Sequence, residues 1–146
     1  MQEDALAALA GRSLPGGRYR IEAVENHEFC NAVGVEPDPN GLAHPLFYYI
    51  ASQAAMGVSV SDLLAMCAFD VDDGPMMVGS DASFAAELQV GVEYTVAGTI
   101  VSLTRKPSRT FGIADTLVFR LTLTDPEGLE CVAATSSWIL PRRQFT

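Results

Sequence analysis

The segment from Gly41 to Gly57, GLAHPLFYYIASQAAMG, constrains the fold more than any other part of the chain. After Pro45 it holds no charged residue, and only Ser52 and Gln53 are clearly polar. A surface helix carries a single apolar stripe, whereas a helix that is apolar on nearly every side has to be covered on most of them. At about 1.5 Å of rise per residue this helix is too short to cross a bilayer. We therefore expect a buried helix that the rest of the chain wraps.

The composition predicts one folded domain over residues 1–146. With 49% hydrophobic residues, the chain can bury a core without disulfides or metal. The three cysteines cannot all pair and none lies in a CxxC motif, so buried free thiols in a reducing compartment are expected at Cys30, Cys67 and Cys131. The N-terminus has acids where a signal peptide has its basic region. A cytoplasmic protein without a membrane segment is therefore expected.

The charge distribution excludes one class of function. A formal net charge of −9 argues against a nucleic-acid-binding protein, which needs a basic surface. No Lys or Arg occurs between residues 21 and 104, although that span holds twelve acids. Basic residues gather later, in a cluster of Arg105, Lys106 and Arg109 and in the pair Arg142–Arg143. These groups are interpreted either as solvated surface clusters or as a phosphate docking site on an otherwise acidic protein.

The second half of the chain has the period of β-strands. Apolar and polar residues alternate over residues 84–90, 94–100, 117–124 and 129–140, with a turn-rich piece at 105–112. The sequence Asp125-Pro126-Glu127-Gly128 predicts a hairpin turn. Earlier in the chain, residues 18–24 alternate as a first strand, and short helices are expected over 4–10, 25–33 and 61–69, the last with Ser59 or Ser61 as its N-cap.

Long alternating strands joined by short turns predict an antiparallel meander with one buried face. That sheet and the apolar helix each need the other as cover, so we predict an α+β fold, a single hot-dog unit in which the sheet wraps the helix. Such a unit leaves sheet edges and part of the helix open, so pairing with another unit is expected. The DVDDG run at 70–74 lacks the spaced ligands of a calcium loop. Neither a metal site nor a cofactor is predicted.

Four segments, in order, resemble the MaoC-like dehydratases, the (R)-specific enoyl-CoA hydratases. Residues 11–34 resemble that family's opening, with Phe29, Ala32 and Gly34 in an F-x-x-A-x-G pattern, and GLAHPLF resembles the start of its central helix. Residues 84–106 resemble its strand–turn–strand, and residues 115–142 its closing hairpin. The resemblance spans nearly the whole chain and rests on the order and spacing of these segments. It implies an acyl-CoA or another acyl thioester as ligand.

The resemblance also implies a chemistry, the hydration of a trans-2-enoyl thioester by an Asp and a His in a G-D-x-N-P-x-H loop. Placing Gly34 on the family glycine puts Val35 and Asn40 at the acid and base positions, and neither transfers a proton. The nearest acid and base are Asp38 and His44, which are the predicted catalytic pair if the chain is an enzyme.

Each candidate also has a structural interpretation. Asp38 fits a turn acid that bonds local backbone, and His44 fits a histidine at the start of the helix that bonds a backbone carbonyl. The basic cluster would pair with CoA phosphates. The predicted substrate-binding residues are a second loop acid, a loop amide, a helix tyrosine and that cluster: Glu36, Asn40, Tyr48, Arg105, Lys106 and Arg109.

Four functions are compatible with these residues. The chain is an enoyl-CoA hydratase, a non-catalytic hot-dog subunit that binds the acyl chain or completes a partner's pocket, a thioesterase using Glu36 or Asp38 on water, or a binder of an unrelated small molecule. We favour a degenerate or partner-dependent site. The expected partners are the acyl thioester and a second hot-dog subunit, in a homodimer or a heterodimer, with no nucleic acid and no membrane.

Overall fold

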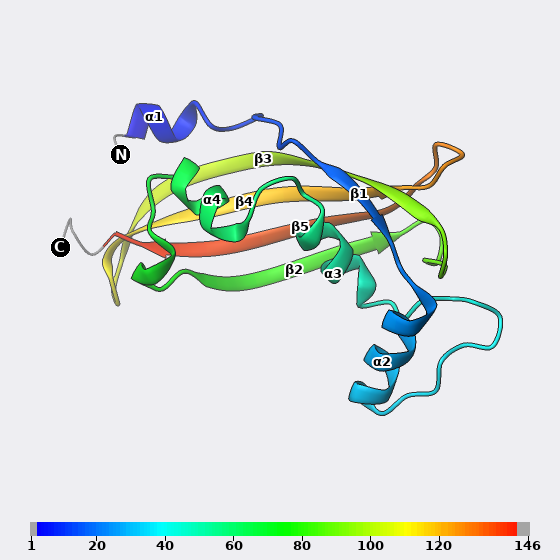
Figure 1. The fold of residues 1–146 in the computed structure, drawn as a ribbon. Coiled ribbons are helices and arrows are strands. Elements are labelled where there is room, and N and C mark those ends of the chain that lie inside the picture. Colours follow the sequence, from blue (N-terminus) through cyan, green and yellow to red (C-terminus); the bar gives the residue numbers. More distant parts are fainter. Residues whose placement is uncertain (1–2, 143–146) are drawn as a thin grey trace.

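The structure, a computed structural model, describes residues 3–142. Its framework is one antiparallel sheet in the order β1-β3-β4-β5-β2 (Figure 1). The strands are β1 (Gly17–Arg20), β2 (Met76–Phe84), β3 (Glu93–Ser108), β4 (Gly112–Thr124) and β5 (Glu130–Pro141). The short strands β1 and β2 form the two edges, so the long hairpins of β3, β4 and β5 make the body of the sheet.

The helices are α1 (Glu3–Ala7), α2 (Ala23–Val33), α3 (Phe47–Ala54), α4 (Val60–Met66) and the single 3-10 turn η1 (Val71–Asp73). Figure 1 shows α3 and α4 against one face of the sheet and α2 at one end of it. α3 contacts β1, β4 and β5, so the sheet curves around this helix. This arrangement confirms the predicted α+β hot-dog architecture. No helix within the described residues is long and apolar enough to span a membrane.

The apolar helix is fully covered on one side and partly covered on the other. Phe47 and Ala51 expose no surface and belong to a core cluster with Leu88, Tyr94 and residues of β4 and β5. A second core cluster lies between α4 and the middle of the sheet. On the other side of α3, Leu46 is 47% exposed and Tyr49 is half-buried. Within α3 only Ala54 is exposed, so the expectation that most of the helix is covered is confirmed, with one side only partly covered.

The central helix is also shorter than predicted. It spans Phe47–Ala54, whereas the apolar segment after Pro45 predicted a helix that continues to a C-cap at Gly57. Residues 41–46 form turns and one bridge from Leu42 to the chain after β2, because Pro45 keeps the residue before it out of the helical conformation. The first strand, β1, ends at Arg20 and is shorter than predicted, because α2 already begins at Ala23. α2 continues to Val33, so this helix is longer than the one or two turns expected.

The predicted strand over residues 84–90 is wrong. The strand in this region is β2, which ends at Phe84, and the alternating residues follow it as a bend whose Ala86, Leu88 and Val90 pack into the core. An irregular segment that packs against a core can alternate like a strand. β2 itself lies at the sheet edge and begins with the apolar run Met76–Val78, so it shows no alternation.

The remaining connections follow the prediction with one exception. Asp125 accepts hydrogen bonds at its Oδ1 from the amides of Glu127 and Leu129, both at 2.9 Å, which closes the predicted hairpin turn. Ser59 caps α4 by accepting from the Asp62 amide. The exception is the stretch after Thr104, where β3 continues to Ser108 instead of turning. Pro107 is tolerated there because β1 pairs only with residues 93–96, so the outer edge of β3 needs no donor at this point.

Candidate functional site

The predicted catalytic loop opens onto a cavity of about 400 Å³ at the end of the sheet where α2 lies. The loop reaches this place because the Ala43 amide donates to the Leu88 carbonyl at 2.8 Å and the His44 amide donates to Oδ1 of the buried Asn26 at 2.9 Å. Apolar side chains form its walls and polar ones its mouth, and the lining residues are Cys30, Val35, Glu36, Asp38, Leu42, Ala43, His44, Pro45, Phe84, Glu87 and Leu88.

His44 is held at the cavity by its own ring nitrogen. Nδ1 lies 3.1 Å from the Leu46 amide, and because an amide N–H can only donate, Nδ1 is the acceptor. The neutral ring therefore carries its proton on Nε2. The ring also meets Phe29 edge-on, with 4.9 Å between centroids. His44 thus bonds backbone at the start of the helix as expected, but its partner is an N–H rather than a carbonyl.

Asp38 lines the same cavity and is likewise bonded to local backbone. Its Oδ1 accepts from the Asn40 amide at 2.6 Å, and its carbonyl accepts from the Gly41 amide at 3.3 Å. This is the turn geometry that short acidic side chains favour. Asn40 itself is exposed and does not line the cavity.

Two further carboxylates stand at the mouth. Glu36, a predicted binding residue, lines the cavity, and so does Glu87, which sequence reasoning placed on the outer side of a strand. Both are exposed, and neither makes a hydrogen bond to another described residue. With Asp38 they make the mouth acidic, which disfavours the phosphates of a CoA molecule at this position.

Tyr48 lies outside the cavity. Its hydroxyl is 3.0 Å from Oγ of Ser80 on β2, and it lines a separate, shallow apolar groove of about 300 Å³ between α3 and β2. The other residues of this groove are Phe29, Leu46, Tyr49, Ile50, Met77 and Ser80. The role of Tyr48 in substrate binding stays a prediction. A ligand that contacts Tyr48 would lie in this groove, between α3 and β2.

The basic cluster belongs to the end of β3 and the turn into β4, which Figure 1 shows at the opposite end of the sheet from α2, whose Cys30 lines the cavity. Lys106 follows Tyr94, which is near the cavity, by twelve residues on β3, so about 40 Å of strand separates them. Arg105 forms two hydrogen bonds with Asp115, at 2.8 and 3.1 Å, and its side chain is 12% exposed. Lys106 and Arg109 are exposed. The structure thus separates the cluster from the predicted pair instead of bringing them together.

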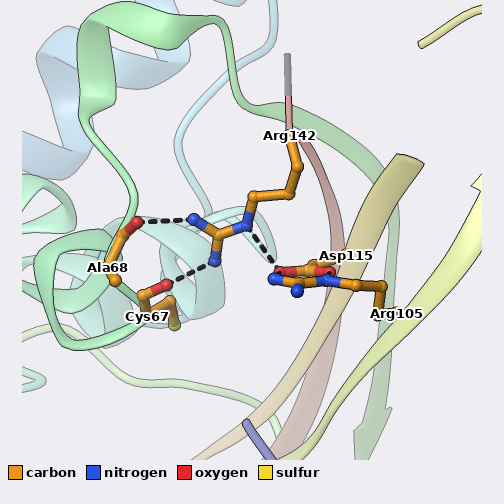
Figure 2. Close-up of polar contacts among 5 residues, drawn as sticks. All are labelled: Cys67, Ala68, Arg105, Asp115 and Arg142. Atoms are coloured by element: carbon orange, nitrogen blue, oxygen red, sulfur yellow. Dashed lines mark hydrogen bonds and ion pairs between the residues drawn. The ribbon is translucent and has the colours of Figure 1, made fainter. Parts of the chain in front are cut away.

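Arg142 is not the solvated surface residue expected, because it is fully buried. Figure 2 shows its guanidinium between Asp115 and the end of α4. Nε donates to Asp115 Oδ2 at 2.6 Å, and the two terminal nitrogens donate to the carbonyls of Cys67 and Ala68. The inward position of Asp115 had a signal in the sequence, since it shares the parity of the buried Leu117 and Phe119 on β4. Arg143, the other member of the predicted pair, lies outside the described residues.

The cysteines are free and buried, as predicted. Cys30 lines the cavity, with Sγ 3.9 Å from Oδ1 of Asn26. Burial raises the pKa of Cys67 to about 11, with Arg142 opposing that shift and Asp115 adding to it. Burial likewise raises the pKa of Cys131, with the Asp125 carboxylate adding to it. Within residues 3–142, no group of three or more His, Cys, Asp or Glu is arranged to hold a metal ion.

No protein-family model matches the chain. No curated protein matches it either. Solved structures do resemble it, although their sequences differ widely from this one.

The HadBC complex from Mycobacterium tuberculosis, a 3R-hydroxyacyl-ACP dehydratase, is 18% identical with a TM-score of 0.66, and the match covers 90% of this chain and 96% of that one. A MaoC-like dehydratase is 17% identical with a TM-score of 0.72, over 92% of this chain and 43% of that one. A hypothetical thioesterase from Streptococcus pneumoniae is 14% identical with a TM-score of 0.56, over 84% of this chain and 78% of that one. At such identities the likeness shows the fold. The chain therefore has the hot-dog fold of the MaoC-like dehydratases.

Proposed function

We propose that this chain binds an acyl thioester in the cavity beside His44 and acts as one half of an enoyl-thioester hydratase or dehydratase. A second hot-dog chain supplies the groups that transfer protons. The proposal is supported by the fold, by the resemblance of the segments around the cavity, and by the cavity itself, whose apolar walls suit an acyl chain.

The observation that carries the proposal is the hydrogen bonding of the predicted pair. A general base needs a free lone pair facing the substrate water. The Nδ1 lone pair of His44 is taken by the Leu46 amide, and Nε2 bears the proton. One carboxylate oxygen of Asp38, Oδ1, accepts the hydrogen bond from the Asn40 amide that closes the turn. In this arrangement His44 is a hydrogen-bond donor, suited to a thioester carbonyl, and it does not activate water.

A partner is supported by the open edge of the sheet. β2 is an edge strand of nine residues with exposed Met76, Met77, Val78 and Phe84. The unpaired backbone groups of an edge strand are a template for another strand, and the exposed Asp81 is the one charged residue on β2. The apolar groove beside it joins this edge to the exposed side of α3. Together they form the surface on which a second hot-dog unit would complete both the sheet and the cover of the helix.

The same pairing gives the basic cluster a role. Lys106 and Arg109 lie about 40 Å along the strand from their own cavity, too far to hold the phosphates of a CoA bound there. If two such units pair with their β2 edges antiparallel, the β3–β4 hairpin of each unit comes to the end of the joined sheet where the partner's cavity lies. The cluster of this chain would then serve the CoA of the partner's site.

The test is an assay of the purified chain alone against a panel of trans-2-enoyl-CoA thioesters, with acyl-CoA binding measured on the same sample by calorimetry. Binding without turnover above a no-enzyme control is the expected result. Turnover that is lost in Asp38→Asn and His44→Ala, with both variants folded, would overturn the partner-dependent site and make this chain a hydratase on its own. Absence of binding by a folded sample would overturn the acyl-thioester proposal altogether.

A thioesterase is the second candidate, and Glu36 is the observation that favours it. Its carboxylate lines the cavity and carries no hydrogen bond to a described residue, so it is available to activate water. Release of free thiol from saturated acyl-CoA, lost in Glu36→Gln and retained in Glu87→Gln, would establish this activity. No release from any acyl-CoA would eliminate it.

A further inference from the structure

Two groups of exposed acids lie at the two ends of the edge strand β2. The cavity-end acids, Glu36, Asp38 and Glu87, surround the cavity that Phe84 lines, where β2 ends. The start acids, Asp70, Asp72 and Asp73, belong to η1 and its cap, just before β2 begins at Met76. All six are exposed. β2 therefore has exposed apolar residues at its start and at Phe84, an exposed carboxylate at Asp81 in its middle, and further carboxylates beyond both of its ends.

The open surface fixes how a second hot-dog unit can dock. The apolar groove is lined both by α3 and by β2, so a partner that covers it must carry its own helix on the same side of the joined sheet. A twofold axis perpendicular to the sheet is the arrangement that does this, and it makes the two edge strands antiparallel. The end of β2 in one unit then lies beside the start of the corresponding strand in the other.

In a pair made of two copies of this chain, that arrangement places like charges together. The cavity-end acids of each copy meet the start acids of the other, at both ends of the interface. No Lys or Arg occurs between residues 21 and 104, a span that contains α2, α3, α4 and β2, so none of these elements offers a cation. Arg142 is buried and bonded to Asp115.

The exposed cations of the β3–β4 hairpin are too distant to offset this repulsion between carboxylates. Lys106 and Arg109 lie two or three strands away from β2 in the sheet order, which is about 10 to 14 Å at ordinary strand spacing. Charges on the surface are screened over about 8 Å at physiological ionic strength. The nearest charges across the interface are therefore carboxylates facing carboxylates.

We propose that the edge strand β2 pairs with a different hot-dog chain rather than with a second copy, and that this chain carries Lys or Arg at both ends of its own edge strand. The inference rests on the proposed pairing of hot-dog units and specifies the partner's chemistry. Opposite charges at the two ends would set the register of the paired strands and exclude the homodimer, since like charges across an interface act as a barrier to the wrong partner.

The test gives the chain the charges that the proposed partner would carry, so that two copies can pair. In Asp72→Lys with Asp73→Lys, the start acids become cationic and face the cavity-end acids of a second copy at both ends. Asp70 is left in place because it caps η1 through the Asp72 amide. Sedimentation at low ionic strength should find the wild-type chain monomeric at concentrations at which the variant is a dimer, with self-affinity at least tenfold higher. Added salt should weaken the variant dimer.

The matched control is Asp4→Lys with Glu22→Lys, which makes the same change of net charge at exposed positions in α1 and just after β1, the opposite edge of the sheet from β2. It should remain monomeric. A wild-type homodimer that is stable at low ionic strength would overturn the proposal, as would a variant that is folded by circular dichroism and no more dimeric than the control. Acyl-CoA binding measured on the same samples separates the two proposals. Absence of acyl-CoA binding would contradict the proposed acyl-thioester function, but it would not contradict the proposal that charge excludes the homodimer.

Discussion

The guanidinium of Arg142 and the carboxylate of Asp115 meet at 2.6 Å, and neither side chain exposes any surface. Asp115 also accepts two hydrogen bonds from Arg105, while Arg142 donates to the carbonyls that end α4 (Figure 2). A cation at this position complements the negative end of the helix dipole. The contact therefore ties β4, the end of β5 and α4 into one unit.

Asp115→Asn should be among the most destabilising isosteric changes in this chain. It leaves Arg142 buried without a counter-charge, and breaking a buried pair in this way costs about 3–5 kcal/mol. Urea denaturation measures the loss. Glu130→Gln is the control, because its bond to Arg120 joins two half-exposed side chains and is worth less than about 1 kcal/mol. Equal losses in the two variants would show that Arg142 is not held by its carboxylate.

Much of the architecture could be predicted from the sequence because it depends on local patterns. The hairpin at Asp125, the cap at Ser59 and the alternation of β4 and β5 each follow from a few adjacent residues. β2 was misplaced because an edge strand that awaits a partner need not alternate. The outer side of the predicted apolar helix is only half-buried for the same reason, since in the proposed pair another chain completes its cover.

The candidate site was less predictable. That Asp38 and His44 line one cavity followed from their closeness in the chain, but their hydrogen bonds to the Asn40 and Leu46 amides depend on the route of the loop. Glu87 reaches the same cavity from 43 residues beyond His44, and no local pattern contains that contact. Arg142 was misjudged because charge alone favours the surface, and its buried acceptors come from distant segments.

The folded chain should lose stability in alkaline solution, and Cys67 should account for part of the loss. Its pKa is raised to about 11, chiefly by burial, whereas a cysteine in an unfolded chain titrates near about 8.5. Below that value the thiol is protonated in both states and stability is fully present. As pH rises towards 11, only the unfolded chain ionises, and about 3 kcal/mol is lost.

Denaturant titrations at pH 8 and pH 10.5 on the wild type and Cys67→Ala measure this contribution. The variant should be less stable at pH 8, because it loses buried packing, and should fall less steeply between the two values. Tyr94 and Cys131, whose pKa values burial also raises, remain in both proteins and cancel in the comparison. Parallel decreases would contradict the assignment to Cys67.

Gly57→Ala should destabilise the chain far more than Gly41→Ala. Both glycines have left-handed φ angles, of 90° and 85°, so each substitution carries the same strain of about 1–2 kcal/mol. At Gly57 an added Cβ would also lie 2.6 Å from the backbone N and O of Gly16, whereas at Gly41 it would meet open space. Thermal or urea unfolding of the two variants measures the difference, and equal effects would mean that the turn after α3 yields easily.

His44 should act on ligands through Nε2 alone. In His44→Asn the side-chain oxygen can replace Nδ1 as acceptor for the Leu46 amide, so the start of α3 is kept while the outer donor is lost. Acyl-CoA affinity should fall about 2- to 10-fold, the range for one neutral hydrogen bond. His44→Ala should lose the same affinity and some stability in addition. Wild-type affinity in His44→Asn, measured by calorimetry, would exclude a ligand bond from Nε2.

The basic cluster should matter only in the paired state. Lys106→Ala with Arg109→Ala should leave acyl-CoA binding by the monomeric chain unchanged, because the cluster is about 40 Å along the strand from its own cavity. Arg105 is kept in this test because its bonds to Asp115 are structural. In the Asp72→Lys, Asp73→Lys dimer, where each hairpin reaches the partner's cavity end, the same change should weaken CoA binding. The weakening should shrink as salt screens the phosphates. An equal loss in the monomer would mean that the cluster serves its own cavity, and no loss in either form would return it to plain surface.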